Sequence, residues 1–140
     1  MIYKFNAYRH PNILATHKTT LEFTKDNDLS PRGNCIVGVN ADFDLEKIRK
    51  FIKNTKNNKT TITIETLNEK YKKIKETLNA EISQKFRSDK EFVIRKTDFA
   101  SERTFAIRAN KAAFDLNRDF IAFLKGKKNK ISVVIENNEE

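Results

Sequence analysis

The side chains that most often bind metal ions or act as nucleophiles are scarce in this chain. It contains two histidines, His10 and His17, and a single cysteine, Cys35. With Asp42 they supply ligand types that zinc accepts, but no His-x-His or Cys-x-x-Cys pair brings two ligands close together. We therefore predict no metal site and no cofactor, and we expect the histidines to be structural residues bonded to loop backbone.

Nucleophilic catalysis has equally little support in the sequence. Cys35 begins the apolar run Cys35–Val39, where a cysteine is normally a small core residue rather than a reactive thiolate. Ser30 and Ser101 lack a G-x-S-x-G context, and the three glycines of the chain form no phosphate-binding loop. The sequence therefore favours a protein without enzymatic activity.

Positive charge is the clearest functional indication. The 140 residues include 28 Lys and Arg against 19 Asp and Glu, which gives a net charge of +9 and a pI of about 9.7. Such an excess is typical of proteins that bind nucleic acids or other polyanions. A genome rich in A and T produces the same abundance of Lys, Asn and Ile without selection for binding, so charge alone leaves both explanations open.

The sequence from 32 to 65 recurs from 103 to 136, at a constant offset of 71 positions (103 − 32). Identical residues align without a gap, among them Arg32 with Arg103 and the tripeptide Phe43–Leu45 with Phe114–Leu116. We interpret this as an internal duplication within one domain, with a first repeat at 1–66 and a second at 67–137. Equivalent strands, helices and basic residues are then expected in both halves.

Residue periodicity predicts a mainly β chain with two short helices. Strands are expected at 2–8, 13–24, 35–39, 60–65, 91–96, 104–108 and 131–136. In each repeat an asparagine, Asn40 or Asn110, can cap a helix by accepting a bond from a backbone N–H. The first helix continues through the apolar positions Leu45, Ile48, Phe51 and Ile52. The second is expected to reach Lys125, where Gly126 ends it.

Segment 67–87 fits two interpretations. Leu67, Tyr71, Ile74, Leu78 and Ile82 are spaced as on one face of an amphipathic helix. The duplication, however, aligns this segment with the strand-like beginning of the first repeat. We follow the duplication and predict two strands, at 73–78 and 80–87.

Five stretches of the chain carry a resemblance to a known family: His10-Pro11, Ala15–Glu22, Pro31–Val39, Ile94–Phe99 and Arg108–Ala113, the last continuing to Asp115 and Leu116. Over nearly its whole length the chain resembles an archaeal family, domain of unknown function 371. The resemblance implies a mainly β fold similar to a jelly roll, in an archaeal cytosol, and no activity, because none is assigned to the family. With the duplication, we predict a jelly-roll-like sandwich or partly closed barrel with pseudo-two-fold symmetry.

The sequence also indicates a cellular location. No stretch of about 18 apolar residues is present to span a membrane, and the N-terminus lacks the apolar core of a signal peptide. A single cysteine allows no internal disulfide and is typical of a reducing cell interior. We expect a cytoplasmic protein that does not contact membranes, and the sequence predicts no particular oligomeric state.

The basic residues suggest a repeated anion site. In each half an arginine, Arg32 or Arg103, starts a strand that leads to the expected helix N-terminus at Asn40 or Asn110, where free N–H groups attract anions. Further positive charge in the second half comes from Arg95, Lys96, Arg108 and Lys111. The alternative is that Arg32 and Arg103 lock their loops through ion pairs with the available acids, Asp42, Asp44, Asp98 and Asp115.

These residues lead to three functional hypotheses. The first is a non-enzymatic binding module for a phosphate-bearing partner, with RNA as the first candidate. Exposed Phe or Tyr beside the basic loops would indicate binding of single strands; the phenylalanines on helix faces are expected in the core, namely Phe43, Phe51, Phe114, Phe120 and Phe123. The second is an enzyme or metabolite-binding protein with a pocket between the repeats, lined by His10, His17, Asp98 and Arg103. The third is a protein–protein adaptor with an exposed apolar patch.

Overall fold

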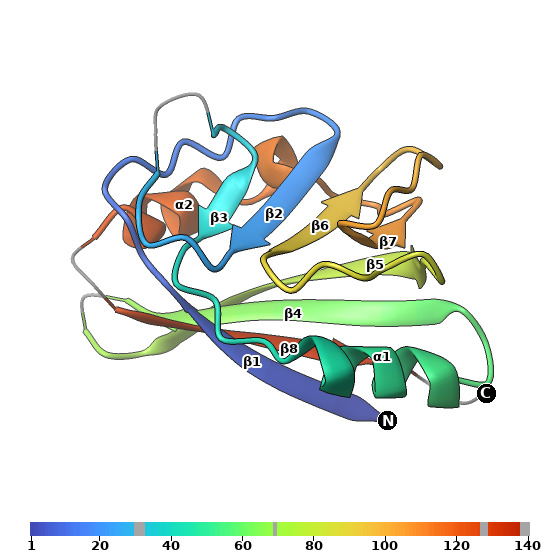
Figure 1. Cartoon of the computed structure of the whole chain (residues 1–140). Helices are drawn as coiled ribbons and strands as arrows, with labels where there is room; N and C mark the ends of the chain where they lie inside the picture. The colour runs from blue at the N-terminus through green and yellow to red at the C-terminus, as the bar shows by residue number, and fades with distance from the viewer. Residues whose placement is uncertain (30–32, 69, 127–128, 138–140) are drawn as a thin grey trace.

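A computed structural model describes residues 1–29, 33–68, 70–126 and 129–137, and within them the chain forms eight strands and two α-helices (Figure 1). The first half contains β1 (Ile2–Tyr8), β2 (Thr20–Thr24), β3 (Ile36–Gly38), α1 (Leu45–Asn54) and β4 (Lys59–Leu67). The second half contains β5 (Lys73–Ile82), β6 (Glu91–Arg95), β7 (Thr104–Ile107), the short 3-10 helix η1 (Ala113–Asp115), α2 (Arg118–Leu124) and β8 (Lys130–Glu136). The mainly β prediction with two short helices is confirmed.

All eight strands belong to one mixed sheet with the order β1-β8-β4-β5-β7-β6-β2-β3. The pairs β2–β3 and β6–β7 are parallel, and the other neighbours are antiparallel. The first and last strands of this order, β1 and β3, approach each other at a single isolated bridge between Tyr8 and Val39. One bridge does not close the sheet into a barrel, so the expectation of a jelly-roll or barrel is not confirmed.

A glycine permits the close approach of β3 to β1. A Cβ atom added at Gly38 would lie 2.9 Å from the Cβ of Ala7 and 2.9 Å from a ring carbon of Phe23. Both neighbours are fully buried, so neither can move aside without disturbing the core. Any larger residue at this position would therefore force β1 and β3 apart.

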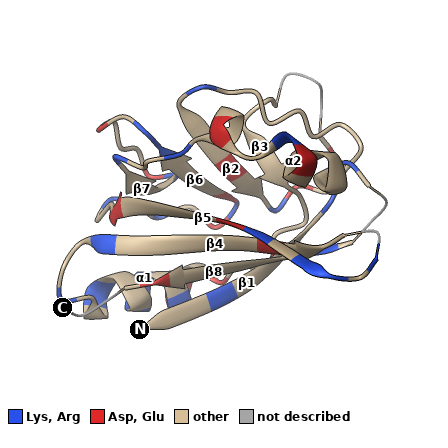
Figure 2. Ribbon diagram, turned by 180° about the vertical axis from the view of Figure 1, so that it is seen from behind, with Lys and Arg blue, Asp and Glu red and all other residues tan. Residues whose placement is uncertain are grey.

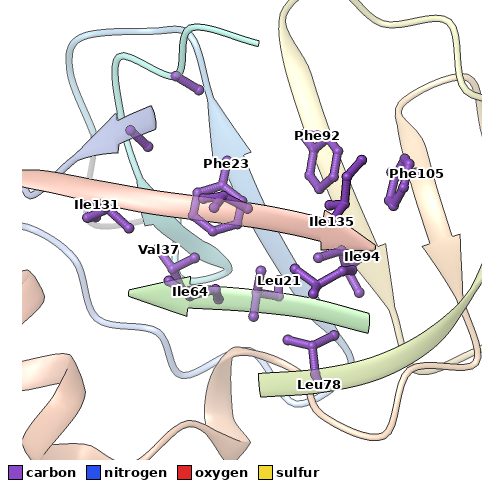
Figure 3. Close-up of a cluster of buried hydrophobic side chains, with 14 of the residues drawn as sticks. Leu21, Phe23, Val37, Ile64, Leu78, Phe92, Ile94, Phe105, Ile131 and Ile135 are labelled. Atoms are coloured by element: carbon purple, nitrogen blue, oxygen red, sulfur yellow. The ribbon is translucent and has the colours of Figure 1, made fainter. Parts of the chain in front are cut away.

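The inner face of the sheet is packed with aliphatic and aromatic side chains (Figure 3). In β4 and β8 every second residue is buried, as the two-residue period of a strand requires. Six buried phenylalanines form the centre of the core: Phe5, Phe23, Phe43, Phe86, Phe92 and Phe105. The ring of Phe92 lies within 6.3 Å of the other five, measured between ring centroids, and stacks on Phe105 at 4.6 Å. Each such burial contributes roughly 1.5–3 kcal/mol.

Three predicted strands were wrong in extent. The strand expected at 13–24 begins only at Thr20, because Ala15 has a φ of 51° and the Nδ1 of His17 accepts N–H bonds from Thr19 and Thr20 in a loop. The two strands expected at 73–78 and 80–87 form the single strand β5, which ends at Ile82. The hairpin register with β4 runs unbroken along this strand, which also excludes the helical interpretation of the segment.

The predicted helix caps were also wrong. Asn40 has a φ of 52° and its N–H donates to the carbonyl of Asp26 in a loop; Asp44 caps α1 instead, with Oδ1 accepting the N–H of Lys47. Asn110 exchanges two bonds with the backbone of Asn79, accepting its N–H and donating to its carbonyl. The cap of α2 is Asn117, so the helix expected from Asn110 to Lys125 is replaced by η1 and the shorter α2. Gly126 follows the C-cap of α2, as predicted.

The aromatic cluster generates a stability prediction. Phe92→Ala removes the ring that contacts all five neighbours, and the loss of packing together with the cavity left behind should lower the free energy of unfolding by roughly 3–5 kcal/mol. Urea denaturation followed by circular dichroism measures this value. The exposed Phe99 supplies the control, because Phe99→Ala should change stability by no more than about 0.5 kcal/mol. Equal losses in the two variants would contradict the central role of Phe92.

Candidate nucleic-acid interface

Four of the five basic residues predicted in the second half are engaged in ion pairs; Arg95 is the exception. Arg103 pairs with Glu91 at 2.5 Å, Arg108 with Glu81 at 2.9 Å, Lys96 with Asp115 at 2.9 Å and Lys111 with Glu76 at 3.5 Å. Arg103 does lock its loop through an acid, but that acid is Glu91 rather than one of the four aspartates considered. Exposed pairs of this kind contribute only about 0–1 kcal/mol each. They nevertheless reduce the net positive field over this part of the surface.

The expected helix N-termini do not lie where the anion site was predicted. Neither Asn40 nor Asn110 caps a helix, so the backbone beside them offers no row of free helical N–H groups. Asn110 is instead bonded to β5 through Asn79. Arg32, the predicted partner of Asn40, lies outside the described residues.

The four residues of the alternative pocket lie in separate contacts. His10 faces Asp28 at 3.4 Å, and His17 accepts two backbone N–H bonds in its loop, as expected of a structural histidine. Asp98 is exposed, and Arg103 pairs with Glu91. Within the described part of the chain, no hydrogen bond or ion pair joins any two of these four residues. In the same part of the chain, no group of three His, Cys, Asp or Glu side chains could hold a metal ion.

Two phenylalanine rings stand in solvent beside arginines of the second half. Phe99, in the loop after β6, is 60% exposed, and Phe114, in η1, is 53% exposed. The guanidinium carbon of Arg95 lies 5.0 Å from the ring centroid of Phe99, and that of Arg118 lies 5.9 Å from the ring centroid of Phe114. Both distances are within the range of cation–π attraction.

Backbone bonds hold the two rings on neighbouring segments. The N–H of Lys96 donates to the carbonyl of Thr19, and the N–H of Phe114 donates to the carbonyl of His17. The ion pair between Lys96 and Asp115 joins the two aromatic segments directly. We call the resulting region the aromatic–basic surface; it comprises Lys18, Arg95, Lys96, Phe99, Phe114 and Arg118.

Arg118 organises one side of this surface. Its Nη2 donates to the carbonyls of Ala15, Ala113, Phe114 and Leu116 at 2.9–3.2 Å. These acceptors are neutral, and no carboxylate among the described residues pairs with this arginine. Its positive charge is therefore held in a fixed position without being neutralised.

Arg95 is held on the other side by a hydroxyl group. Its Nε donates to the Oγ1 of Thr104 at 3.0 Å. Burial, and then the charge of Arg103, lower the pKa of Arg95, but a guanidinium stays protonated at neutral pH. Both arginines of the aromatic–basic surface therefore carry a positionally restrained charge next to an exposed ring.

The comparisons with known proteins agree with the resemblance found in the sequence. Residues 5–138 match the model of a family described as a domain of unknown function (DUF371). The chain belongs to this family. An uncharacterised protein of the archaeon Methanocaldococcus jannaschii is 36% identical over 137 residues, which cover 96% of this chain and 99% of the relative. Among the described residues of this DUF371 chain, no helix is long and apolar enough to cross a membrane.

A buried polar cluster lies next to Arg95. Glu22, on β2, is only 8% exposed, and burial followed by the charge of Glu91 raises the pKa of its carboxyl to about 7. The thiol of Cys35 lies 3.8 Å from Glu22 Oε1, and burial raises its pKa to about 11. A thiol with such a pKa stays protonated and is a weak nucleophile.

Sequence reasoning missed several of these residues. Phe114 was expected in the core but is half exposed, because η1 interrupts the predicted helix and turns its ring outward. Phe99 and Arg118 were not singled out, although a phenylalanine within the polar loop 97–103 is a signal that could have drawn attention. The burial of Glu22 depends on how distant strands pack, and no local pattern reveals it.

The Glu22 carboxyl generates a pH-dependent prediction. Its pKa rises from 4.5 to about 7 on folding, so the folded chain holds a proton that the unfolded chain releases, and stability falls as pH rises from 4.5 to 7. Glu22→Gln removes the ionisable group and therefore abolishes this loss of stability at high pH. At pH 8 the variant should exceed the wild type by about 3 kcal/mol, and at pH 4.5 the two should be nearly equal.

Thermal melts at the two pH values measure this difference. Glu102→Gln, at an exposed position, is the matched control and should leave the difference between pH 8 and pH 4.5 unchanged. A gain from Glu22→Gln of the same size at both pH values would show that ionisation of Glu22 is not its cause.

Proposed function

We propose that this DUF371 chain is a non-enzymatic binding module whose aromatic–basic surface takes single-stranded nucleic acid, with RNA as the first candidate. The observation that carries the proposal is the pairing of each exposed ring, Phe99 and Phe114, with an arginine. An exposed phenyl ring offers a stacking platform for a base, and the adjacent guanidinium attracts phosphate.

The arginines are suited to this role because they are already ordered. Arg95 is held by Thr104, and Arg118 by the carbonyls of Ala113 on η1 and of Ala15 in the connection between β1 and β2. A long side chain that is fixed before binding loses less conformational entropy when the ligand arrives. Base stacking on a protein ring contributes about 1–3 kcal/mol per base, so two rings support measurable affinity for a short strand.

The charges near the rings favour a ligand with few phosphate contacts. Lys18 is exposed between the two residues that anchor the aromatic segments, whereas the charge of Lys96 is shared with Asp115. For single strands the logarithm of the binding constant falls by about 0.7 per phosphate contact for each tenfold rise in salt. Two or three contacts therefore predict a moderate salt dependence, with stacking supplying the rest of the affinity.

We further infer that the chain arose by duplication, which bears on the number of sites. Support comes from the strand registers: Glu22 pairs with Val93, and Thr63 pairs with Val134, and in each pair the two numbers differ by 71 (93 − 22 and 134 − 63). Phe43, the equivalent of Phe114 at this offset, is buried. A duplicated chain would thus expose a ring at this position in its second repeat alone, and one strand would bind per chain.

The proposal predicts the effect of removing both rings. Phe99→Ala combined with Phe114→Ala should weaken binding of a ten-nucleotide single-stranded RNA at least tenfold, because two stacking platforms are lost. Fluorescence anisotropy with labelled oligo-U at about 50 mM KCl measures the affinity. Tyr71→Ala is the matched control, since Tyr71 is 82% exposed and lies on the hairpin between β4 and β5.

Two outcomes would contradict the proposed binding of single-stranded nucleic acid. One is a wild-type chain that binds neither RNA nor single-stranded DNA at this salt concentration. The other is a double variant whose affinity equals that of the wild type. Absence of nucleic-acid binding by the wild-type chain would favour the hypothesis of a protein–protein adaptor, because exposed phenyl rings also anchor contacts between proteins.

A further inference from the structure

A second basic region lies along α1. Figures 1 and 2 place α1 beside the N-terminus, and α2 at the opposite side of the molecule. A groove of about 770 Å³ runs between α1 and the connection that follows β5. Its charged and polar lining includes Lys47, Arg49, Lys50, Lys53, Glu46 and Gln84.

The sequence of α1 explains why these cations face the solvent. Ile48, Phe51 and Ile52 are buried against the sheet, so the remaining positions of this amphipathic helix point outward. Asp44 fixes the beginning of the helix, and its N–H donates to the hydroxyl of Tyr3 on β1 at 2.9 Å. The basic face therefore rests on a well-anchored helix.

Arg49 is positioned for a ligand by backbone carbonyls. Its Nη1 donates to the carbonyl of Gln84 at 3.3 Å and to that of Phe86 at 2.9 Å. Because the Phe86 side chain is completely buried, this anchor is rigid. Nε and Nη2 have no acceptor among the described residues. They form a planar pair of donors, the geometry with which arginine grips two oxygens of a phosphate.

The lysines beside Arg49 lack acidic partners. Lys47, Lys50 and Lys53 form no ion pair with a carboxylate in the part of the chain that the structure describes. Like charges spaced three or four residues apart on a helix are destabilising by a few tenths of a kcal/mol per pair, and Lys47 lies in the first turn, where the helix dipole disfavours a cation. A bound anion would relieve both effects.

We propose that this groove binds a ligand carrying two or more adjacent phosphate groups. Arg49 grips two oxygens of one phosphate through Nε and Nη2, and the lysines neutralise the next. Four cations against the single carboxylate of Glu46 favour more than one phosphate. The volume lies within the range of small-molecule sites. The site is independent of the aromatic–basic surface and does not need it.

Isothermal titration calorimetry of the full chain with inorganic tripolyphosphate at about 50 mM NaCl tests the site. Lys50→Gln combined with Lys53→Gln should weaken binding at least tenfold, and Arg49→Lys should weaken it severalfold because the charge remains but the paired donors are lost. Lys70→Gln combined with Lys72→Gln, exposed on the hairpin after β4, is the control and should bind as the wild type does. Thermal melts verify that each variant is folded.

The variants also separate a free ligand from a nucleic-acid backbone. The double variant at Phe99 and Phe114 should bind tripolyphosphate normally, even if it loses RNA. If the variant at Lys50 and Lys53 loses RNA to the same extent as tripolyphosphate, the groove takes phosphates of a strand; if it loses tripolyphosphate alone, the ligand is free. The proposal is overturned if the wild-type protein does not bind tripolyphosphate, or if the control loses as much affinity as the groove variants.

Discussion

The packing of Phe92 against five other rings is the interaction on which the rest of the structure depends. Its neighbours come from β1, β2, β7 and two connections, so one side chain joins segments from both halves of the sequence. Aromatic pairs in tilted or edge contact add about 0.5–1.5 kcal/mol beyond the burial of their area. The same strand, β6, ends at Arg95, and the loop that follows carries Phe99. Packing in the core thereby fixes the position of the strand from which Arg95 and the loop carrying Phe99 extend into the aromatic–basic surface.

Net charge proved a poor guide to where the positive field is concentrated. The arginines and lysines noticed first, in the second half, are largely balanced by Glu76, Glu81, Glu91 and Asp115. Among the described residues, cations that pair with no carboxylate include the lysines of α1 and the two arginines beside the exposed rings, Arg95 and Arg118. Because an ion pair forms between residues that are distant in sequence, such as Arg108 and Glu81, counting charges along the chain cannot distinguish a neutralised region from an open one.

Much of the fold followed from local pattern, and the failures have a common physical cause. Alternation identified β1 and β4, helical spacing identified α1, and the family was found from five short stretches. The errors in the helix caps occurred where one polar residue is compatible with two different local conformations. Asn40 suits a helix cap equally well as a loop position with positive φ, and only the bond to Asp26 decides between them. The exposure of Phe99 and Phe114 was likewise set by tertiary packing.

The bridge between Tyr8 and Val39 joins the two edges of the open sheet at one point, between β1 and the residue that follows β3. Only two backbone hydrogen bonds, of 2.7 and 2.9 Å, join Tyr8 and Val39 at this point. The hairpin of β4 and β5, by contrast, is paired over nine residues of β4. Because Gly38 has no Cβ atom, β1 and β3 can approach closely enough to form this bridge. A single added carbon atom at this position would separate the two strands and widen the gap in the sheet.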